Sequence, residues 1–339
     1  MDSNKDIYSI SSDLELNIKN IEVFRANNEY IAASTDENRI YIYSINTLKK
    51  LYSYDFNSII DFQFHPKYNN VIAVSLFESK VILCHINTKD NKIEEKVTYQ
   101  GNKNDYLLKT IFSLYENGNY LASLFYKSIR IWDMKSHYYI YNMNINDKNP
   151  KTKWSGRGTY LIYRKNKNRL EIFSIELKTI EFHLDNNEVK ICKKGEYIHD
   201  FYLLEENEKI LLLIMKSESI LLITLSKTEE NNQSIQINRI INYSSIFSVE
   251  SNYDYFNSLL YLFHKDNIIL YDIKAKKEIF KYSLNDCEEF FLLNGDNNSK
   301  LISKLIIKIN EDEFKKELIL SKKDIQFYYQ KIDDAPDNF

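Results

Sequence analysis

Ile129-Arg130-Ile131-Trp132-Asp133-Met134 is a short alternating stretch that follows the polar turn Lys127-Ser128. Five other stretches share this build, with an apolar or alternating run after a short polar turn: residues 40–45 (IYIYSI), 81–86 (VILCHI), 170–175 (LEIFSI), 220–225 (ILLITL) and 268–273 (IILYDI). Side chains on a strand alternate between two faces, and Ile, Tyr and Phe pack well on a pleated surface. Each of the six stretches is therefore predicted to be a β-strand.

The six stretches line up on the position of Trp132. The aligned column contains Tyr43, Cys84, Trp132, Phe173, Ile223 and Tyr271, with successive spacings of 41, 48, 41, 50 and 48 residues. A repeat of roughly 40 to 50 residues that contains only strands is the period of a β-propeller blade. The predicted fold class is therefore all-β, a seven-bladed β-propeller that forms one domain over residues 1–320. This architecture favours a binding role before any catalytic motif is sought.

The last blade is predicted from the weaker runs 290–293, 301–309 and 317–320. We expect its fourth strand to come from residues 6–10, because a strand from the other end of the chain closes the ring and leaves no free sheet edge. Residues 321–339 then form a short C-terminal extension. It is expected either to pack on the propeller or to be partly disordered.

Composition argues against two classes of partner. A net charge of -3 disfavours a general nucleic-acid binder, which needs a basic face for the phosphate backbone. The longest apolar stretch, residues 210–225, is interrupted by Lys216 and Glu218, and the N-terminus lacks a secretory signal, so no membrane role is expected. The three cysteines are scattered, which does not suggest a disulfide framework and fits a reducing cytoplasm.

No catalytic, cofactor or metal motif is found in the sequence. The six histidines fall in different units, and Cys84 and His85 are neighbours on a strand, so they point to opposite faces and do not easily share one metal. There is no nucleophile elbow, no phosphate-cradling glycine-rich loop and no distinct pair of carboxylates. We therefore expect a protein that is not an enzyme, with no cofactor. An enzyme that uses the central channel is the least favoured alternative.

The most concentrated charge lies in residues 148–169, which contain eight basic residues and no Asp or Glu. Uncompensated positive charge on one blade of an acidic protein creates a local field that attracts an acidic partner. The other interpretation is a solvated lysine-rich surface that reflects biased codon usage. The first of the eight is Lys148. The candidate partner-binding residues are the other seven: Lys151, Lys153, Arg157, Arg164, Lys165, Lys167 and Arg169.

Trp132-Asp133, preceded by Leu121-Ala122-Ser123, resembles a WD-repeat blade. No unit carries a Gly-His pair, so most of the Ser, His, Asp and Trp hydrogen-bond network of that family is expected to be absent. Trp132 is instead expected to be a packing residue between blades.

Three segments resemble, in order, the propeller of coronin, an actin-filament-associated WD-repeat protein. They are residues 60–66 (IDFQFHP) followed by 70–73 (NVIA), residues 153–158 (KWSGRG) followed by 160–162 (YLI), and residues 317–324 (ELILSKKD) followed by Phe327 and 333–336 (DDAP). The resemblance implies a WD-repeat interaction protein that binds actin filaments or actin-regulating partners. It also implies a cytoplasmic, cytoskeleton-associated location.

Two features expected of coronins are replaced or missing in this sequence. The basic N-terminal segment is replaced by residues 1–10, which hold one Lys and two Asp. No coiled coil follows the propeller, so a monomer is expected. The alternative function is a WD-repeat scaffold subunit of an unrelated assembly, such as a nuclear, ribosome-maturation or trafficking complex.

Overall fold

The structure is a computed structural model, and its described part consists of seven four-stranded antiparallel sheets, one 3-10 turn and one single-turn α-helix. It describes residues 8–11, 21–27, 29–44, 47, 49–87, 89–90, 92–193, 196, 198–206, 209–216, 219–227, 233–242, 250–254, 259–264, 267–273, 275, 277–283, 289–294, 301–310 and 313–321. The chain divides into two compact units, Glu22–Val249 and a second unit formed by Met1–Ile21 with Glu250–Phe339. The all-β class predicted from the sequence is confirmed.

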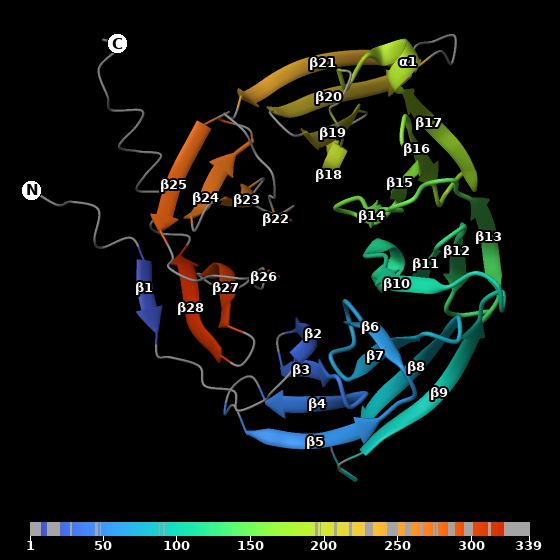
Figure 1. Cartoon of the computed structure of the whole chain (residues 1–339), viewed down its shortest axis with the longest axis vertical. Coiled ribbons are helices and arrows are strands. Elements are labelled where there is room, and N and C mark those ends of the chain that lie inside the picture. The colour runs from blue at the N-terminus through green and yellow to red at the C-terminus, as the bar shows by residue number, and fades with distance from the viewer. Residues whose placement is uncertain are drawn as a thin grey trace, which may run out of the picture. The chain divides into compact units, whose positions relative to one another are not determined.

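The larger unit contains five sheets, each built from four consecutive strands (Figure 1). The first two sheets are β2 (Ile21–Ala26), β3 (Tyr30–Thr35), β4 (Arg39–Ser44) and β5 (Lys50–Asp55), then β6 (Ile59–Phe64), β7 (Val71–Leu76), β8 (Lys80–Asn87) and β9 (Lys92–Gln100). The third sheet is β10 (Leu107–Phe112), β11 (Tyr120–Phe125), β12 (Ser128–Asp133) and β13 (Tyr139–Asn144), with the 3-10 turn η1 (Tyr115–Asn117) between β10 and β11.

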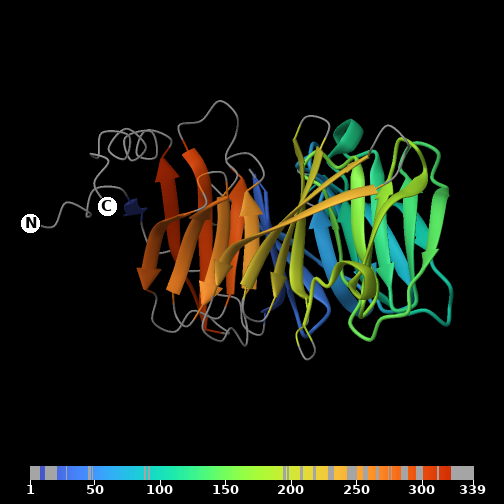
Figure 2. The same ribbon diagram turned by 90° about the horizontal axis from the view of Figure 1, so that it is seen from above.

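The fourth and fifth sheets complete this unit. Their strands are β14 (Thr152–Trp154), β15 (Tyr160–Asn166), β16 (Arg169–Ser174) and β17 (Thr179–Asp185), then, after helix α1 (Asn186–Val189), β18 (Ile198–Glu206), β19 (Lys209–Lys216), β20 (Ser219–Lys227) and β21 (Gln233–Asn242). Figure 2 shows the strands of each sheet standing side by side. The meander order follows from short connections, which join antiparallel neighbours without a crossover.

Buried side chains hold neighbouring sheets of the larger unit together. The first strands β6, β10, β14 and β18 contact one another in succession, and the fourth strands lie on the opposite side of each sheet (Figure 1). One core cluster joins Val74 and Ile82 of the second sheet to Ile40 and Ile42 of the first. Another joins the fourth and fifth sheets through Ile172 and Leu212. Sheet therefore packs on sheet, as in propeller blades.

The smaller unit contains two sheets. The first has β22 (Glu250–Asp254), β23 (Leu259–His264), β24 (Asn267–Asp272) and β25 (Lys277–Ser283), and the second has β26 (Glu289–Asn294), β27 (Leu301–Asn310), β28 (Glu313–Ser321) and β1 (Tyr8–Ser11). Strand β1 pairs with β28, with Tyr8 opposite Leu320. The strand predicted at residues 6–10 is thus found at 8–11 as the outer strand of the last sheet. The predicted C-terminal extension lies outside the described residues, except Ser321, which ends β28.

The aligned column of the sequence occupies one structural position. Each of its six residues is buried on the third strand of its sheet and faces an apolar residue of the second strand: Tyr43 faces Ile31, Cys84 Ile72, Trp132 Leu121, Phe173 Leu161, Ile223 Leu212 and Tyr271 Leu260. In five of the six sheets the pairing with the fourth strand shifts just before the column residue. Such an irregularity bends the strand and increases its twist. The predicted strands are correct, and five of the six observed strands differ from the prediction by only one residue at each end.

Trp132 packs between two sheets, as predicted. Its ring lies 5.1 Å from the Tyr99 ring, between centroids, and it belongs to a cluster that joins β7–β9 with β10–β12. One bond of the WD-repeat network is nevertheless found, because Trp132 Nε1 donates to Ser123 Oγ at 3.0 Å. The Ser–Trp part of a WD-repeat network is therefore present in this sheet.

Candidate protein-binding surface

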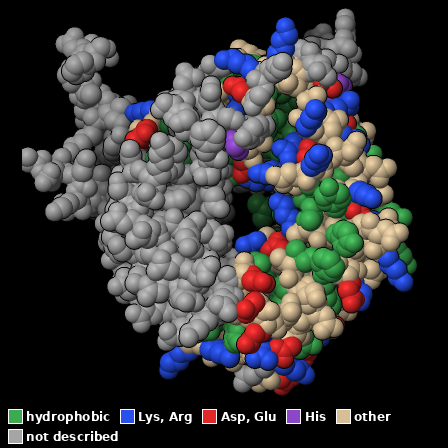
Figure 3. All heavy atoms as spheres, viewed as in Figure 1, with side chains coloured by type: hydrophobic (Ala, Val, Ile, Leu, Met, Phe, Trp, Pro, Cys, Tyr) green, Lys and Arg blue, Asp and Glu red, His purple; other side chains and the backbone are tan. Residues whose placement is uncertain are grey.

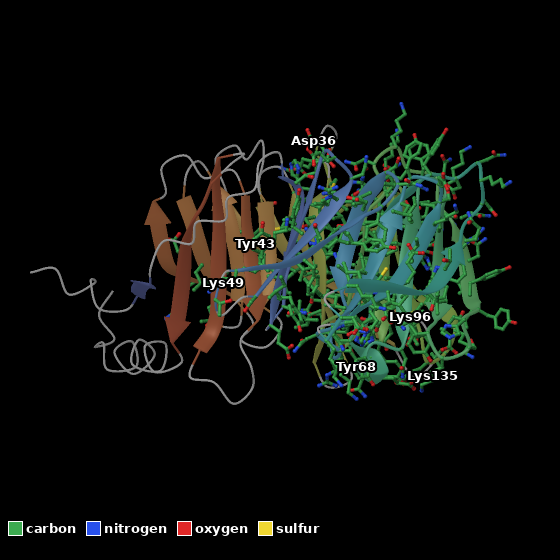
Figure 4. The ribbon with its side chains drawn as sticks, turned by 90° about the horizontal axis from the view of Figure 1, so that it is seen from below. Asp36, Tyr43, Lys49, Tyr68, Lys96 and Lys135 are labelled. Carbon is green, nitrogen blue, oxygen red and sulfur yellow. The ribbon has the colours of Figure 1, made fainter. Side chains whose placement is uncertain are left out.

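The meander places alternate loops at opposite ends of the five sheets in the larger unit. Loops between the first and second strands, and between the third and fourth, lie at the end that carries Tyr68 and Lys135 (Figure 4). Turns between the second and third strands lie at the end that carries Asp36, as do the links to the next sheet. We call these the Tyr68 end and the Asp36 end. Any partner that touches several loops must approach one of these two ends.

Three of the seven predicted binding residues are held in ion pairs. Lys153 Nζ lies 2.6 Å from Asp200 Oδ2. Arg164 Nε lies 2.7 Å from Asp147 Oδ2, and Arg169 Nε lies 2.9 Å from Glu171 Oε1. The side chains of Asp147 and Glu171 are each only 5% exposed. The description of this basic segment as uncompensated is therefore wrong for these three cations, because their acids lie just outside residues 148–169 or on the next sheet.

The other four predicted residues do not form one cluster. Lys151, just before β14, donates a hydrogen bond from Nζ to the His199 carbonyl. Arg157 is exposed in the β14–β15 loop, at the Tyr68 end. Lys165 and Lys167 are at the Asp36 end, where Lys165 Nζ donates to the Asn144 carbonyl and Lys167 is exposed. The meander thus distributes neighbours in sequence over separate surfaces, because successive loops lie at opposite ends of the sheet.

A polar groove at the Asp36 end gathers the exposed lysines of this region. It has a volume of about 910 Å³, and its lining includes Tyr126, Lys127, Asn144, Asn146, Lys148 and Lys167. The three lysines are exposed, and the Asp147 carboxylate that also lines the groove is bound to Arg164. The groove therefore carries a positive field that favours an acidic partner.

An exposed aromatic ridge adjoins this groove. Phe77 and Tyr106 stack with their ring centroids 5.3 Å apart, and the Tyr126 N–H donates to the Tyr106 carbonyl at 2.9 Å. These three side chains are 56%, 54% and 42% exposed. Figure 3 shows hydrophobic and basic side chains side by side on an end of these sheets. Exposed aromatic groups that cluster mark interaction sites more often than isolated ones do.

The sequence did not point to this ridge, although it contained a signal. Phe77 and Tyr126 each follow the second strand of their units directly, so they occupy the same turn position in neighbouring sheets. A large apolar residue repeated at a turn is out of place in a solvated loop.

The described residues show no arrangement that suggests other chemistry. They contain no group of three or more His, Cys, Asp or Glu side chains placed to hold a metal ion. Cys84 and Cys192 are free thiols, and burial raises the pKa of Cys84 to about 12, which makes it a poor nucleophile. No helix in the described part of the chain is long and apolar enough to span a bilayer.

Comparison with solved structures finds the WD40 domain of Toxoplasma gondii coronin. The match has a TM-score of 0.66 and covers 92% of this chain and 84% of that chain, at 15% sequence identity. The fold is that of a coronin WD40 domain. The prediction of a divergent coronin-like WD-repeat protein is confirmed in this sense, since an identity of 15% shows the fold alone.

Searches with the sequence itself add nothing to this fold assignment. No protein-family model matches the chain, and no curated protein matches it. The fold presents loops of several sheets of the larger unit together on one end. Which partner binds must be argued from the surface of this chain.

Proposed function

We propose that this chain is a non-catalytic interaction protein that binds actin filaments or actin-regulating proteins through the Asp36 end. In this proposal the seven sheets form one closed seven-bladed ring, with β1 as the closing strand, and the protein acts in the cytoplasm with the cytoskeleton. The coronin-like fold supports the partner class. The observation that carries the binding surface is the aromatic ridge beside a groove with three exposed lysines.

The two parts of the surface supply different terms of the binding energy. The ridge offers large, rigid side chains, which are the usual anchors of protein interfaces. The lysines steer an acidic partner toward the groove and fix its orientation, an effect that weakens with salt. A partner that fits both parts presents an apolar side chain next to carboxylates.

Co-sedimentation with actin filaments at physiological salt tests the proposal. The wild-type protein is expected to pellet with filaments. The variant K148E/K167E is expected to bind about tenfold more weakly or worse, because each charge reversal replaces an attraction with a repulsion. The matched control is K67E/R157E, which makes the same change of charge with exposed residues at the Tyr68 end and is expected to bind like wild type.

Two results would contradict the proposal. No pelleting of wild type above background would reject actin filaments as the partner, and copurification in a complex of fixed stoichiometry would then favour the scaffold alternative. Equal pelleting by the two double variants would reject the Asp36 end as the binding surface.

A further inference from the structure

A second basic site lies on the first strands of three neighbouring sheets and shares no residue with the groove. It is a pocket of about 410 Å³ whose polar lining is Lys109, Asn149, Lys151, Thr152, Lys153 and Asp200. Lys109 is on β10, Lys153 on β14 and Asp200 on β18, and these strands contact one another in order. We call it the lysine pocket.

The charges of the lysine pocket do not balance. Three lysines and one aspartate give a net charge of +2, since 3 − 1 = 2. The Asp200 carboxylate is engaged by Lys153, which also lies 3.6 Å from the centre of the Tyr202 ring. Lys151 Nζ donates only to the neutral His199 carbonyl. The single acid of the pocket is thus paired directly with one of the three lysines and acts on the other two only through space.

Lys109 is the unmatched cation. Within the described part of the chain its side chain has no hydrogen bond and no ion pair, although it is partly buried. Besides Asp200, the acid that acts on it is Asp61 on β6, and Asp61 Oδ1 already accepts from Arg25 at 2.7 Å. The Arg25–Asp61 pair is neutral as a whole, so including it leaves the excess positive charge of the pocket unchanged. A half-buried ammonium group without a partner is unfavourable unless an anion neutralises it.

We propose that the lysine pocket binds the phosphate group of a small molecule. A phosphate monoester carries about −1.5 to −2 charges at neutral pH, which matches the excess of +2, whereas a carboxylate supplies only one charge. Lysine binds phosphate as a mobile point charge, and each ammonium group offers three donors to the phosphate oxygens. The volume is at the lower end of the range for small-molecule sites, which suits a phosphate with a short organic group.

The electrostatic state of the pocket agrees with this assignment. Burial lowers the pKa of Lys109, and it lowers the pKa of Lys153 to about 8 despite the opposing effect of Asp200. Both lysines are therefore held in surroundings that disfavour their charged form. A bound dianion would restore the charged form and would be bound more tightly for that reason.

This inference does not depend on the proposed function, because the two sites share no residue. The groove residues Lys127, Lys148 and Lys167 lie on turns and links of the Asp36 end, whereas Lys109 and Lys153 lie on strands. Loss of actin binding would leave the lysine pocket intact, and loss of phosphate binding would leave the groove intact.

Isothermal titration calorimetry of the full chain at constant ionic strength tests the assignment. The probes are inorganic phosphate, pyrophosphate and glycerol phosphate, with acetate as the carboxylate reference. Wild type is expected to bind at least one phosphate probe saturably and acetate at least tenfold more weakly. A preference for glycerol phosphate supports an organic phosphate, and a preference for phosphate or pyrophosphate supports a free inorganic ligand.

Lys109→Met removes the unmatched charge and keeps the length of the side chain. It is expected to weaken phosphate binding about tenfold or more, because a hydrogen bond to a charged group is lost. The variant should fold, since it removes an unfavourable charge rather than a contact. The control is Lys103→Met, an exposed lysine of the β9–β10 loop, which should bind like wild type.

The pH dependence supplies a readout that a structural role would not change. A phosphate monoester has a second pKa of about 6 and is almost wholly dianionic above about pH 7.5. Weaker binding of glycerol phosphate between pH 7.5 and 9 therefore reports loss of the Lys153 proton. The groups that face Lys153 in the described sheets are Asp200 and Tyr202 on β18, Lys109 on β10 and Lys151 before β14. The proposal is overturned if no phosphate probe binds saturably, if acetate binds as tightly, if binding is unchanged in Lys109→Met, or if it does not weaken over this pH range.

Discussion

The two ends of the larger unit both expose aromatic side chains and both join neighbouring sheets through hydrogen bonds, but they differ in how far their aromatic and charged side chains are engaged. At the Tyr68 end, loops of different sheets interlock. His65 of the β6–β7 loop packs 4.9 Å from Phe112 of the next sheet, between ring centroids, and lies against Gly118. Ser113 Oγ donates to the Gly158 carbonyl of the sheet after that at 2.7 Å. This end therefore contributes to stability through contacts between sheets.

At the Asp36 end, the second, third and fourth sheets leave a groove and an aromatic ridge open. The lysines of the groove are exposed, and the stacked pair Phe77 and Tyr106 points outward. At the Tyr68 end, by contrast, Lys135 lies 3.4 Å from Glu116, and the Tyr115 hydroxyl donates to Glu176. The comparison separates two roles: substitution of the interlocked residues at the Tyr68 end should affect stability, whereas substitution of the exposed ridge and groove side chains at the Asp36 end should affect binding.

The largest expected effect is on stability, from Gly118→Ala at the Tyr68 end. Gly118 has φ +89°, which L side chains rarely adopt, and a Cβ there would lie 2.5 Å from His65 Cε1. Strain and steric overlap together should lower the free energy of unfolding by about 3 kcal/mol. Urea denaturation measures this loss. Gly156→Ala, two residues before the other positive-φ glycine, Gly158, is the control and should cost less than half as much. Equal losses of unfolding free energy in the two variants would show that the backbone at Gly118 has no special need for glycine.

A smaller effect on stability is expected from acid, through His65. Burial lowers the pKa of His65 to about 4, against 6.5 in the unfolded chain, so the folded state favours the neutral ring. The contribution of His65 is fully present above pH 6.5 and is lost as the pH falls toward 4. Between pH 7 and pH 5 this amounts to about 2 kcal/mol.

Urea denaturation of wild type and His65→Asn at both pH values isolates this contribution. The difference in unfolding free energy between the two proteins should shrink by about that amount at pH 5, because Asn does not titrate. A difference that is the same at both pH values would show that His65 is not held neutral, and the Tyr68 end would then lack this pH sensitivity.

The smallest effect on stability is expected at the Asp36 end. The double variant F77S/Y106S removes two exposed rings and should change the free energy of unfolding by less than about 0.5 kcal/mol per site. Its affinity for the partner should fall about tenfold or more, since aromatic anchors dominate interfaces. Tyr138→Ser at the Tyr68 end, where the side chain is 76% exposed, is the control and should leave both quantities unchanged. Unfolding of F77S/Y106S, or unchanged binding, would contradict the division of roles.

The fold could be predicted from the sequence because the patterns that indicate its strands are local. The column from Tyr43 to Tyr271 repeats at the spacing of one sheet, and alternation identifies each third strand to within a residue or two. The bond from Trp132 to Ser123 was missed, because only the pairing of Trp132 with Leu121 brings its indole next to the hydroxyl two residues further on. Register of this kind is set by packing between strands.

The candidate site could be predicted only in part from the sequence. Residues 148–169 looked like one basic surface, yet Lys153 faces the lysine pocket, Arg157 lies at the Tyr68 end and Lys167 lies in the groove. The partner of Lys153, Asp200, is 47 residues away in sequence. Lys109 gave no signal at all, since a single lysine in a strand is ordinary until its neighbours are known.

The sequence by itself determined that the chain is all-β, that its strands repeat with the period of a propeller blade, and that the column residues are buried. These properties depend on side-chain pattern within a few residues, which physical chemistry links directly to strand formation. Only the tertiary structure decided which cations are matched by acids, which aromatic rings are exposed, and that Lys109, Lys151 and Lys153 share one pocket. Charge balance and exposure depend on distances between sheets, and a linear sequence does not contain those distances.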